Sequence, residues 1–200
     1  MNARTDRGHQ MRVPAKPLRS YPFYLRPFFW NQRRKYGEVL KAALLWARVP
    51  KLFAAVAVLY GVIDRRSSPI DPALRSLVTV RVSQINSCPF CVDINSATLL
   101  KRGVSPDKVD ALETWRQSNL FDSREQAVLD YAEAMTRSDL KVEDEQVEHL
   151  RSYFDDDGIV ELTGLIAFQN MSSKFNSALG VPAQGFCKMP IAGQGESPKP

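Results

Sequence analysis

The sequence predicts an all-α protein: a compact bundle of about eight helices with an extended N-terminal arm. Runs of β-branched residues at alternating spacing, which indicate strands, are nearly absent. The one ambiguous run, at residues 78–82, is flanked by helix signals. Capping and proline signals for helix starts recur along the chain instead. With 200 residues and 44% hydrophobic content, the chain is long enough to bury a core without covalent staples.

The helix boundaries follow from these signals in chain order. Asp71-Pro72 and Ser105-Pro106 each place a capping side chain before a proline at the first helical position. A Ser-x-x-Gln capping box at residues 123–126 opens a later helix. We expect helices at residues 32–47, 51–63, 72–84, 88–102, 106–116, 124–137, 142–153 and 158–179.

Residues 1–30 are expected to form a basic arm, residues 31–187 a helical domain and residues 188–200 a flexible tail. Residues 1–35 hold nine Lys and Arg against Asp6 alone, and the rest of the chain is mildly acidic. Such a charge suits nucleic acid or anionic lipid. The arm carries no nucleic-acid motif, so we expect no nucleic-acid partner. Its six aromatics between residues 21 and 30 are expected to pack against the body or a neighbouring subunit.

The most apolar stretch, residues 52–63, is twelve residues long. A membrane-spanning helix needs about 20 apolar residues, so this stretch is expected to be a buried core helix. The first seventeen residues carry charges without an apolar region, which excludes a signal peptide. We therefore expect a cytoplasmic protein with no membrane span.

The segment SCPFC at residues 87–91 carries the clearest chemistry. With Ser87 as the helix cap, Cys88 lies in the first turn, where free N–H groups and the helix dipole favour a thiolate. Cys91 and Asn95 lie on the same face, one and two turns further on. A CxxC pair is typical of redox dithiols, of half a metal site, or of two small buried side chains.

A metal site would need two further ligands. Three cysteines also cannot form a disulfide framework. His9 falls in the arm and His149 on a polar helix, which leaves Cys187 as the one plausible third ligand. We therefore expect neither a metal nor another cofactor. Cys187 is most simply a free thiol, with a role as a resolving partner as the alternative.

Residues 77–95, followed by the Gly-Val-Ser-Pro turn at 103–106, resemble the carboxymuconolactone decarboxylase family. The alkylhydroperoxidase (AhpD-like) branch is the most similar. A helix before the pair and the CxxC at a helix start carry the resemblance, which extends over roughly residues 35–182. It implies an all-helical subunit that assembles into homo-oligomers, often trimers or hexamers. It also implies a dithiol that reduces peroxides or partner disulfides with electrons from a donor the sequence does not name.

In the AhpD pattern, a glutamate about twelve residues before the first cysteine and a histidine four after the second relay protons. Those positions hold Ser76 and Asn95 here, and neither side chain titrates near pH 7. The resemblance implies that Cys91 attacks the peroxide and Cys88 resolves, whereas the helix dipole alone favours Cys88 as the more acidic thiol. Groups that could substitute for the relay are Arg81, Asp93 and Glu161.

Three functions follow as hypotheses. The leading one is a peroxidase-like thiol–disulfide oxidoreductase that uses Cys88 and Cys91 with a weakened proton relay. The second is a non-catalytic or sensor helical oligomer that binds an apolar ligand. The third is a lyase of the carboxymuconolactone decarboxylase type, which would use acid–base groups on a small lactone acid.

Overall fold

The computed structural model describes residues 11–188, and within that range the chain forms nine α-helices, three 3-10 segments and no strand. The predicted all-α class is confirmed. The α-helices are α1 (Arg26–Tyr36), α2 (Lys41–Trp46), α3 (Pro50–Ile63), α4 (Pro72–Ile85), α5 (Pro89–Lys101), α6 (Pro106–Ala111), α7 (Ser123–Thr136), α8 (Asp144–Arg151) and α9 (Asp156–Ala178). The 3-10 segments are η1 (Leu18–Ser20), η2 (Phe23–Leu25) and η3 (Leu112–Gln117). Residues 1–10, with His9, and residues 189–200 of the expected tail lie outside the described range.

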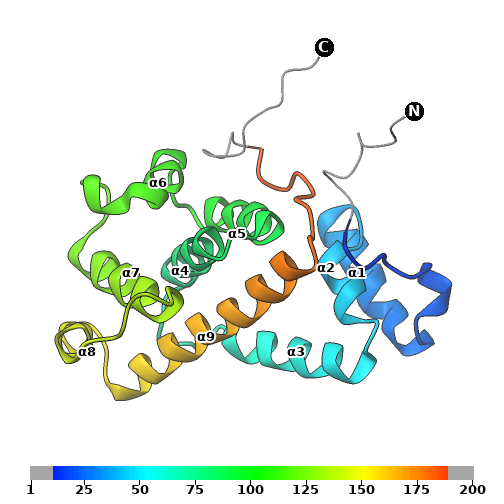
Figure 1. The fold of residues 1–200 in the computed structure, drawn as a ribbon, viewed down its shortest axis with the longest axis horizontal. Coiled ribbons are helices and arrows are strands. Elements are labelled where there is room, and N and C mark those ends of the chain that lie inside the picture. The colour runs from blue at the N-terminus through cyan, green and yellow to red at the C-terminus, as the bar shows by residue number, and fades with distance from the viewer. Residues whose placement is uncertain (1–10, 189–200) are drawn as a thin grey trace, which may run out of the picture.

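The long helix α9 runs through the molecule, with α4, α5 and α7 on one side and α3 on the other (Figure 1). Two hydrophobic clusters hold the helices together. The larger core lies among α4, α7, α8 and α9, with fully buried side chains such as Val80, Val128 and Leu162. The second cluster, the cysteine-side core, joins the arm, α1, α2 and α3 to the start of α5 through side chains such as Phe29 and Phe53.

Several helix starts lie where the capping signals place them. The Asp71 carboxylate accepts the Leu74 N–H at 2.9 Å, and the Ser105 hydroxyl caps α6. The box before α7 is shifted by one residue from the prediction, since Asp122 and Glu125 form it. Both acidic side chains bond reciprocal backbone N–H groups, a stronger arrangement at the positive helix end than Ser and Gln would provide.

The helix expected at residues 32–47 is two helices. Gly37 adopts φ 84°, a left-handed conformation that only glycine reaches without strain, and it ends α1. The chain then turns into α2. Helix α1 begins at Arg26, inside the segment assigned to the arm. The division into arm, domain and tail therefore stays a prediction, with part of the arm helical and continuous with the body.

The aromatic segment of the arm packs on the body through one set of side chains. Tyr21 and Phe29 are buried in the cysteine-side core, and the Tyr21 hydroxyl donates to the Leu44 carbonyl at 2.9 Å. Phe23 and Trp30 are exposed. The packing expected for this segment is thus found within the chain itself for half of the aromatics.

Helix α3 corrects an expectation. Its composition predicted a buried core helix, but Phe53 is the one buried residue in it. Val58 is 69% exposed, and Val62 is exposed as well. Hydropathy counts apolar side chains without telling which face they occupy, and α3 lies at the edge of the molecule (Figure 1). None of the helices in the described part of the chain is long and apolar enough to cross a membrane.

Candidate functional site

The cysteine pair lies at the junction of α4 and α5. Cys88 itself is the N-cap of α5, and its Sγ accepts the backbone N–H of Cys91 at 3.2 Å. Ser87, expected to be the cap, instead has a left-handed backbone with φ 49°. The two cysteines are paired as a disulfide with their Cα atoms 5.3 Å apart. The sulfur of Cys88 therefore occupies the place of a capping oxygen, next to the positive end of the helix.

A cavity of about 310 Å³ lies between α1, α2, α3, α5 and α9. Cys91 lines it, and Cys88 does not. Both cysteines are nearly fully buried, at 3% and 1% exposure. The wall is mainly apolar and aromatic, with Phe28, Trp46, Phe53, Val56, Phe90 and Phe168. A molecule that enters this cavity meets the sulfur of Cys91 first.

Asn176, on α9, contacts the reactive pair. Its Nδ2 donates to Cys91 Sγ at 3.3 Å, while its Oδ1 is buried and finds no donor among residues 11–188. The sequence analysis missed this residue because 85 positions separate it from Cys91. A signal was present, since Gln169, Ser173 and Asn176 recur at intervals of four and three residues and form a polar stripe on one helix face.

Asn95 also lines the cavity, where its Nδ2 donates to the hydroxyl of Ser83 at 3.2 Å. The same hydroxyl accepts from Gln169 Nε2 at 2.9 Å and donates to the Thr79 carbonyl at 2.6 Å. Ser83 thus uses its single proton and both lone pairs. This saturation fixes both amides with their nitrogens toward Ser83.

Ser76, the other expected relay position, lies away from the cavity. Its buried hydroxyl accepts from Arg102 Nη1 at 2.9 Å, and Arg102 also forms an ion pair with Asp64 at 2.7 Å. The structure thus brings Asn95 together with Cys91, while Ser76 is bonded to a guanidinium and is absent from the cavity wall.

The three side chains considered as substitutes for the relay all have structural partners. Arg81 pairs with Glu133, and Glu161 binds Arg65 and Ser68. Asp93 is buried and accepts backbone N–H groups from the C-terminal strap, which we define as residues 181–188. None of the three lines the cavity. They hold the fold, and the sequence could not distinguish this from chemistry.

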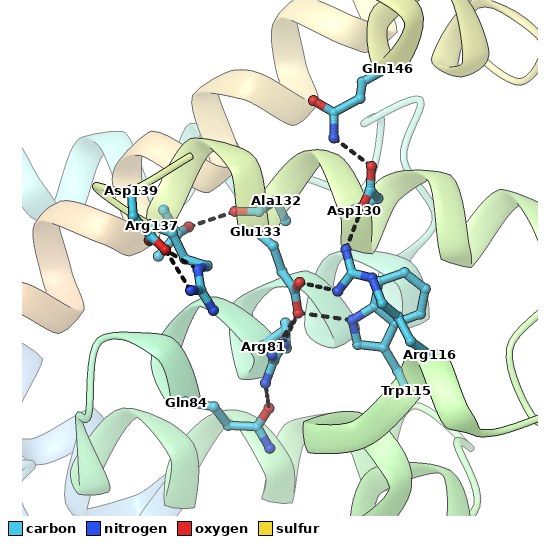
Figure 2. A network of polar contacts seen from close by, with 11 residues as sticks. Arg81, Gln84, Trp115, Arg116, Asp130, Ala132, Glu133, Arg137, Asp139 and Gln146 are labelled. Atoms are coloured by element: carbon cyan, nitrogen blue, oxygen red, sulfur yellow. Dashed lines mark hydrogen bonds and ion pairs between the residues drawn. The ribbon is translucent and has the colours of Figure 1, made fainter. Parts of the chain in front are cut away.

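The Arg81 partner belongs to a polar network on the far side of α4 (Figure 2). Glu133 is 4% exposed and accepts from Arg81 at 2.6 Å, from Trp115 at 2.9 Å and from Arg116. Burial alone would raise the pKa of Glu133, but the hydrogen bonds from Arg116 and Trp115 and the charge of Arg81 outweigh it and lower the pKa. This network ties α4, α7 and η3 together.

The ionisable side chains on the cavity wall, besides Cys91, are Lys35, Tyr36 and Tyr60. Burial and, after it, the charge of Asp64 raise the pKa of Tyr60 to about 12, although about half of its surface (52%) is open. Tyr60 therefore stays protonated at neutral pH. Of the described residues that line the cavity, none is a carboxylate or an imidazole.

His149 lies elsewhere, on α8 beside Tyr153. Among residues 11–188, no group of three or more His, Cys, Asp or Glu side chains gathers as a metal site would require. The site contains a dithiol pair, neutral amides and an apolar cavity. Such a set can carry out nucleophilic and thiol–disulfide chemistry, with little general acid–base help.

Comparisons with known proteins agree with this architecture. The sequence profile of the carboxymuconolactone decarboxylase family matches residues 50–134. The uncharacterized protein YnjA of Escherichia coli is 45% identical over 174 residues, which cover 87% of this chain and 96% of YnjA.

Two solved structures share the fold. An uncharacterized peroxidase-related protein with an alkylhydroperoxidase AhpD core, from Ralstonia eutropha, superimposes with a TM-score of 0.79 at 23% identity over 88% of this chain and 94% of its own. The debrominase Bmp8, in complex with 2,3,4-tribromopyrrole, has a TM-score of 0.75 at 21% identity over 87% and 92% of the two chains. The fold is AhpD-like, and the chain belongs to the carboxymuconolactone decarboxylase family.

Proposed function

We propose that the protein is a peroxidase-like thiol–disulfide oxidoreductase in which Cys91 attacks the substrate and Cys88 resolves. One observation carries the assignment of roles: Cys91 lines the cavity and Cys88 does not. The helix dipole acts on both sulfurs, so access to the cavity separates their roles. This agrees with the role implied by the family resemblance and not with the choice of Cys88 from the dipole alone.

In the proposed cycle, the Cys91 thiolate attacks the terminal oxygen of a hydroperoxide. The O–O bond breaks, the alcohol leaves with a proton, and Cys91 becomes a sulfenic acid. The Cys88 sulfur then displaces the hydroxyl group as water and forms the Cys88–Cys91 disulfide. An external dithiol returns two electrons and two protons and leaves as its own disulfide.

The proton steps of this cycle have weak support from the protein. General acid–base groups contribute typically about 10²–10⁴-fold to a rate, and the cavity wall offers amides and a protonated tyrosine instead. We therefore expect slow peroxide turnover, with a pH profile that follows thiol ionisation rather than a bell set by carboxylate and imidazole.

Peroxide consumption by the wild type, Cys88→Ser and Cys91→Ser tests the proposal, together with thiol counts before and after mild oxidation. Wild type should lose two thiols reversibly, with a loss of two hydrogens mapped to the peptide of residues 87–95. Cys91→Ser should consume no peroxide, whereas Cys88→Ser should react once and stop at a sulfenic acid. A pair that stays reduced under conditions that oxidise ordinary dithiols would contradict the proposal.

A second candidate is the binding of an apolar ligand, with the pair as a sensor. The aromatic wall of the cavity favours it, and a similar fold is found in a debrominase bound to a halogenated pyrrole. Saturable binding of apolar aromatics by a protein inactive toward peroxides and disulfides would favour this candidate. The lyase hypothesis has less support, because acid–base side chains are missing from the described cavity wall.

We further propose a cytoplasmic homo-oligomer, a trimer or hexamer by family resemblance. The apolar side chains that α3 exposes would be covered by another subunit. In the reducing cytoplasm, cysteine pairs that form disulfides are usually catalytic or redox-sensing, which suits the proposed cycle.

A further inference from the structure

Asn176 contacts Cys91 in a way that the proposed cycle does not yet use. The residue is 2% exposed, with Nδ2 directed at Cys91 Sγ and Oδ1 left without a donor among residues 11–188. Buried polar atoms without a hydrogen-bond partner are rare in native proteins, and each one calls for an explanation. Since the amide oxygen and nitrogen share one carbon, the unpaired Oδ1 lies close to the cysteine pair.

We propose that Asn176 is a catalytic residue that stabilises the Cys91 thiolate and shifts the cysteine pair toward its reduced state. The proposal rests on the proposed function in taking Cys91 as the attacking thiolate. The amide supplies a neutral hydrogen-bond donor at the sulfur, in a site whose wall offers no imidazolium.

Reduction of the disulfide changes what Asn176 can bond. Two electrons and one proton from a dithiol break the S–S bond and leave a thiolate at Cys91 and a thiol at Cys88. The Nδ2–H group then donates to an anion instead of a neutral sulfur, and charge-assisted hydrogen bonds are roughly twice as strong as neutral ones. The new S–H group is also a donor, which the pair lacks while oxidised, beside an amide oxygen that lacks one.

The orientation of the amide follows from the same chemistry. A thiolate accepts hydrogen bonds and donates none, so the opposite amide orientation would face the Asn176 oxygen toward an anion. With Nδ2 toward the sulfur, both states of the pair are compatible with one side-chain position.

Other charged or titratable groups near the pair are accounted for on each packed element. Lys35 and Tyr36 come from α1, and the Lys35 ammonium lies 5.0 Å from the Tyr36 ring centre. Tyr60 comes from α3 and stays protonated. On α5 the Asp93 carboxylate is bonded to the strap, which also carries Cys187. Among the described side chains, Asn176 is the one hydrogen-bonded to Cys91 Sγ.

The test compares Asn176→Leu and Asn176→Asp in a Cys187→Ser background. The pH dependence of alkylation gives the pKa of Cys91, and equilibration with dithiothreitol gives the disulfide stability. Asn176→Leu should raise the pKa by about one unit and shift the equilibrium about tenfold toward the disulfide, which is about 30 mV. Asn176→Asp should raise the pKa further, because a carboxylate repels the thiolate.

The order of the two variants separates an electrostatic role from a structural one. Asp has nearly the shape of Asn, so a purely structural role predicts that Asn176→Asp is the milder change. Asn170→Leu is the matched control, since this α9 amide bonds Thr136 instead of a cysteine, and it should leave both quantities unchanged. Should Asn176→Leu fail to fold, the Asn176→Asp result decides alone.

Folded variants with the wild-type pKa and the wild-type equilibrium would overturn the proposal, as would a smaller pKa change in Asn176→Asp than in Asn176→Leu. Both measurements are made without peroxide. A wild-type protein that turns over no peroxide would therefore refute the proposed peroxidase function while leaving this test of Asn176 intact.

Discussion

The carboxylate of Asp93 accepts the backbone N–H of Cys187 at 2.7 Å, only two residues beyond Cys91 in the chain. Its other oxygen accepts the N–H of Gln184 at 2.8 Å. The strap is held further by Val181, which is fully buried in the same cluster as both cysteines. One buried charge on the cysteine helix thus ties down the segment that carries the third thiol.

Replacement of Asp93 by alanine should therefore loosen the strap. Two hydrogen bonds to a charged acceptor are lost, each contributing about 1.5–3 kcal/mol, so alkylation of Cys187 should accelerate about tenfold or more. Mass spectrometry of the alkylated peptide measures the rate. Asp107→Ala, at an exposed position on α6, is the control. Equal alkylation rates in Asp93→Ala and the wild type would mean that the strap is held elsewhere.

Glu133→Gln should destabilise the fold by about 3 kcal/mol at neutral pH, because it removes the charge that three buried or half-buried donors share. Denaturant unfolding gives the free energy, and Glu148→Gln, on an exposed side chain, is the control.

The same substitution predicts a pH dependence. The pKa of Glu133 is lowered in the folded protein, so its stabilisation is fully present above the unfolded-state pKa of about 4.3 and is lost as the pH falls through the folded-state pKa. The difference between wild type and Glu133→Gln should thus narrow in acid. A difference that stays constant from neutral pH into acid would contradict the lowered pKa.

Restoring the family's relay should raise peroxide turnover. Asn95→His places an imidazole on the cavity wall, while Ser76→Glu alone places a carboxylate beside Arg102, which lowers its pKa and makes it a poor base. The double variant should exceed the product of the single effects if the two groups act together. Folding is measured alongside the rates. A folded double variant without any gain would mean that the pair does not follow AhpD-like chemistry.

Charged substitutions on α3 should disrupt self-association. Val58→Lys and Val62→Lys replace exposed apolar side chains, so they should leave the monomer folded while light scattering shows a lower mass. Trp30→Ser makes the matched change on the arm. Removal of residues 1–30 is a less selective test than first expected, since it also deletes buried Tyr21 and Phe29. An unchanged mass in all three point variants would exclude both surfaces as subunit contacts.

The features that the sequence predicted well are local ones. The caps at Asp71 and Ser105 and the placement of a CxxC at a helix start depend on neighbours within four residues, and the structure places them there. Ser87 failed as a cap because the turn from α4 needs one residue with positive φ before α5 can begin, and Ser87 takes that conformation.

The features that the sequence did not predict depend on how distant helices pack. Asn176 reaches Cys91 only because α9 crosses the start of α5, and no local pattern carries that information. Arg102 occupies the hydroxyl of Ser76 for the same reason. Helix α3 was misjudged because burial depends on the neighbours present, and composition does not report them.

The stacking of Trp46 on Phe175 gives the molecule an optical property. The two ring centres are 3.5 Å apart with an angle of 16° between the planes. Of the three tryptophans, Trp46 lines the cavity with Cys91, whereas Trp30 is exposed and Trp115 belongs to the larger core. Its fluorescence should therefore respond both to a ligand that enters the cavity and to the oxidation state of the nearby sulfurs, so that unlabelled protein reports on its own site.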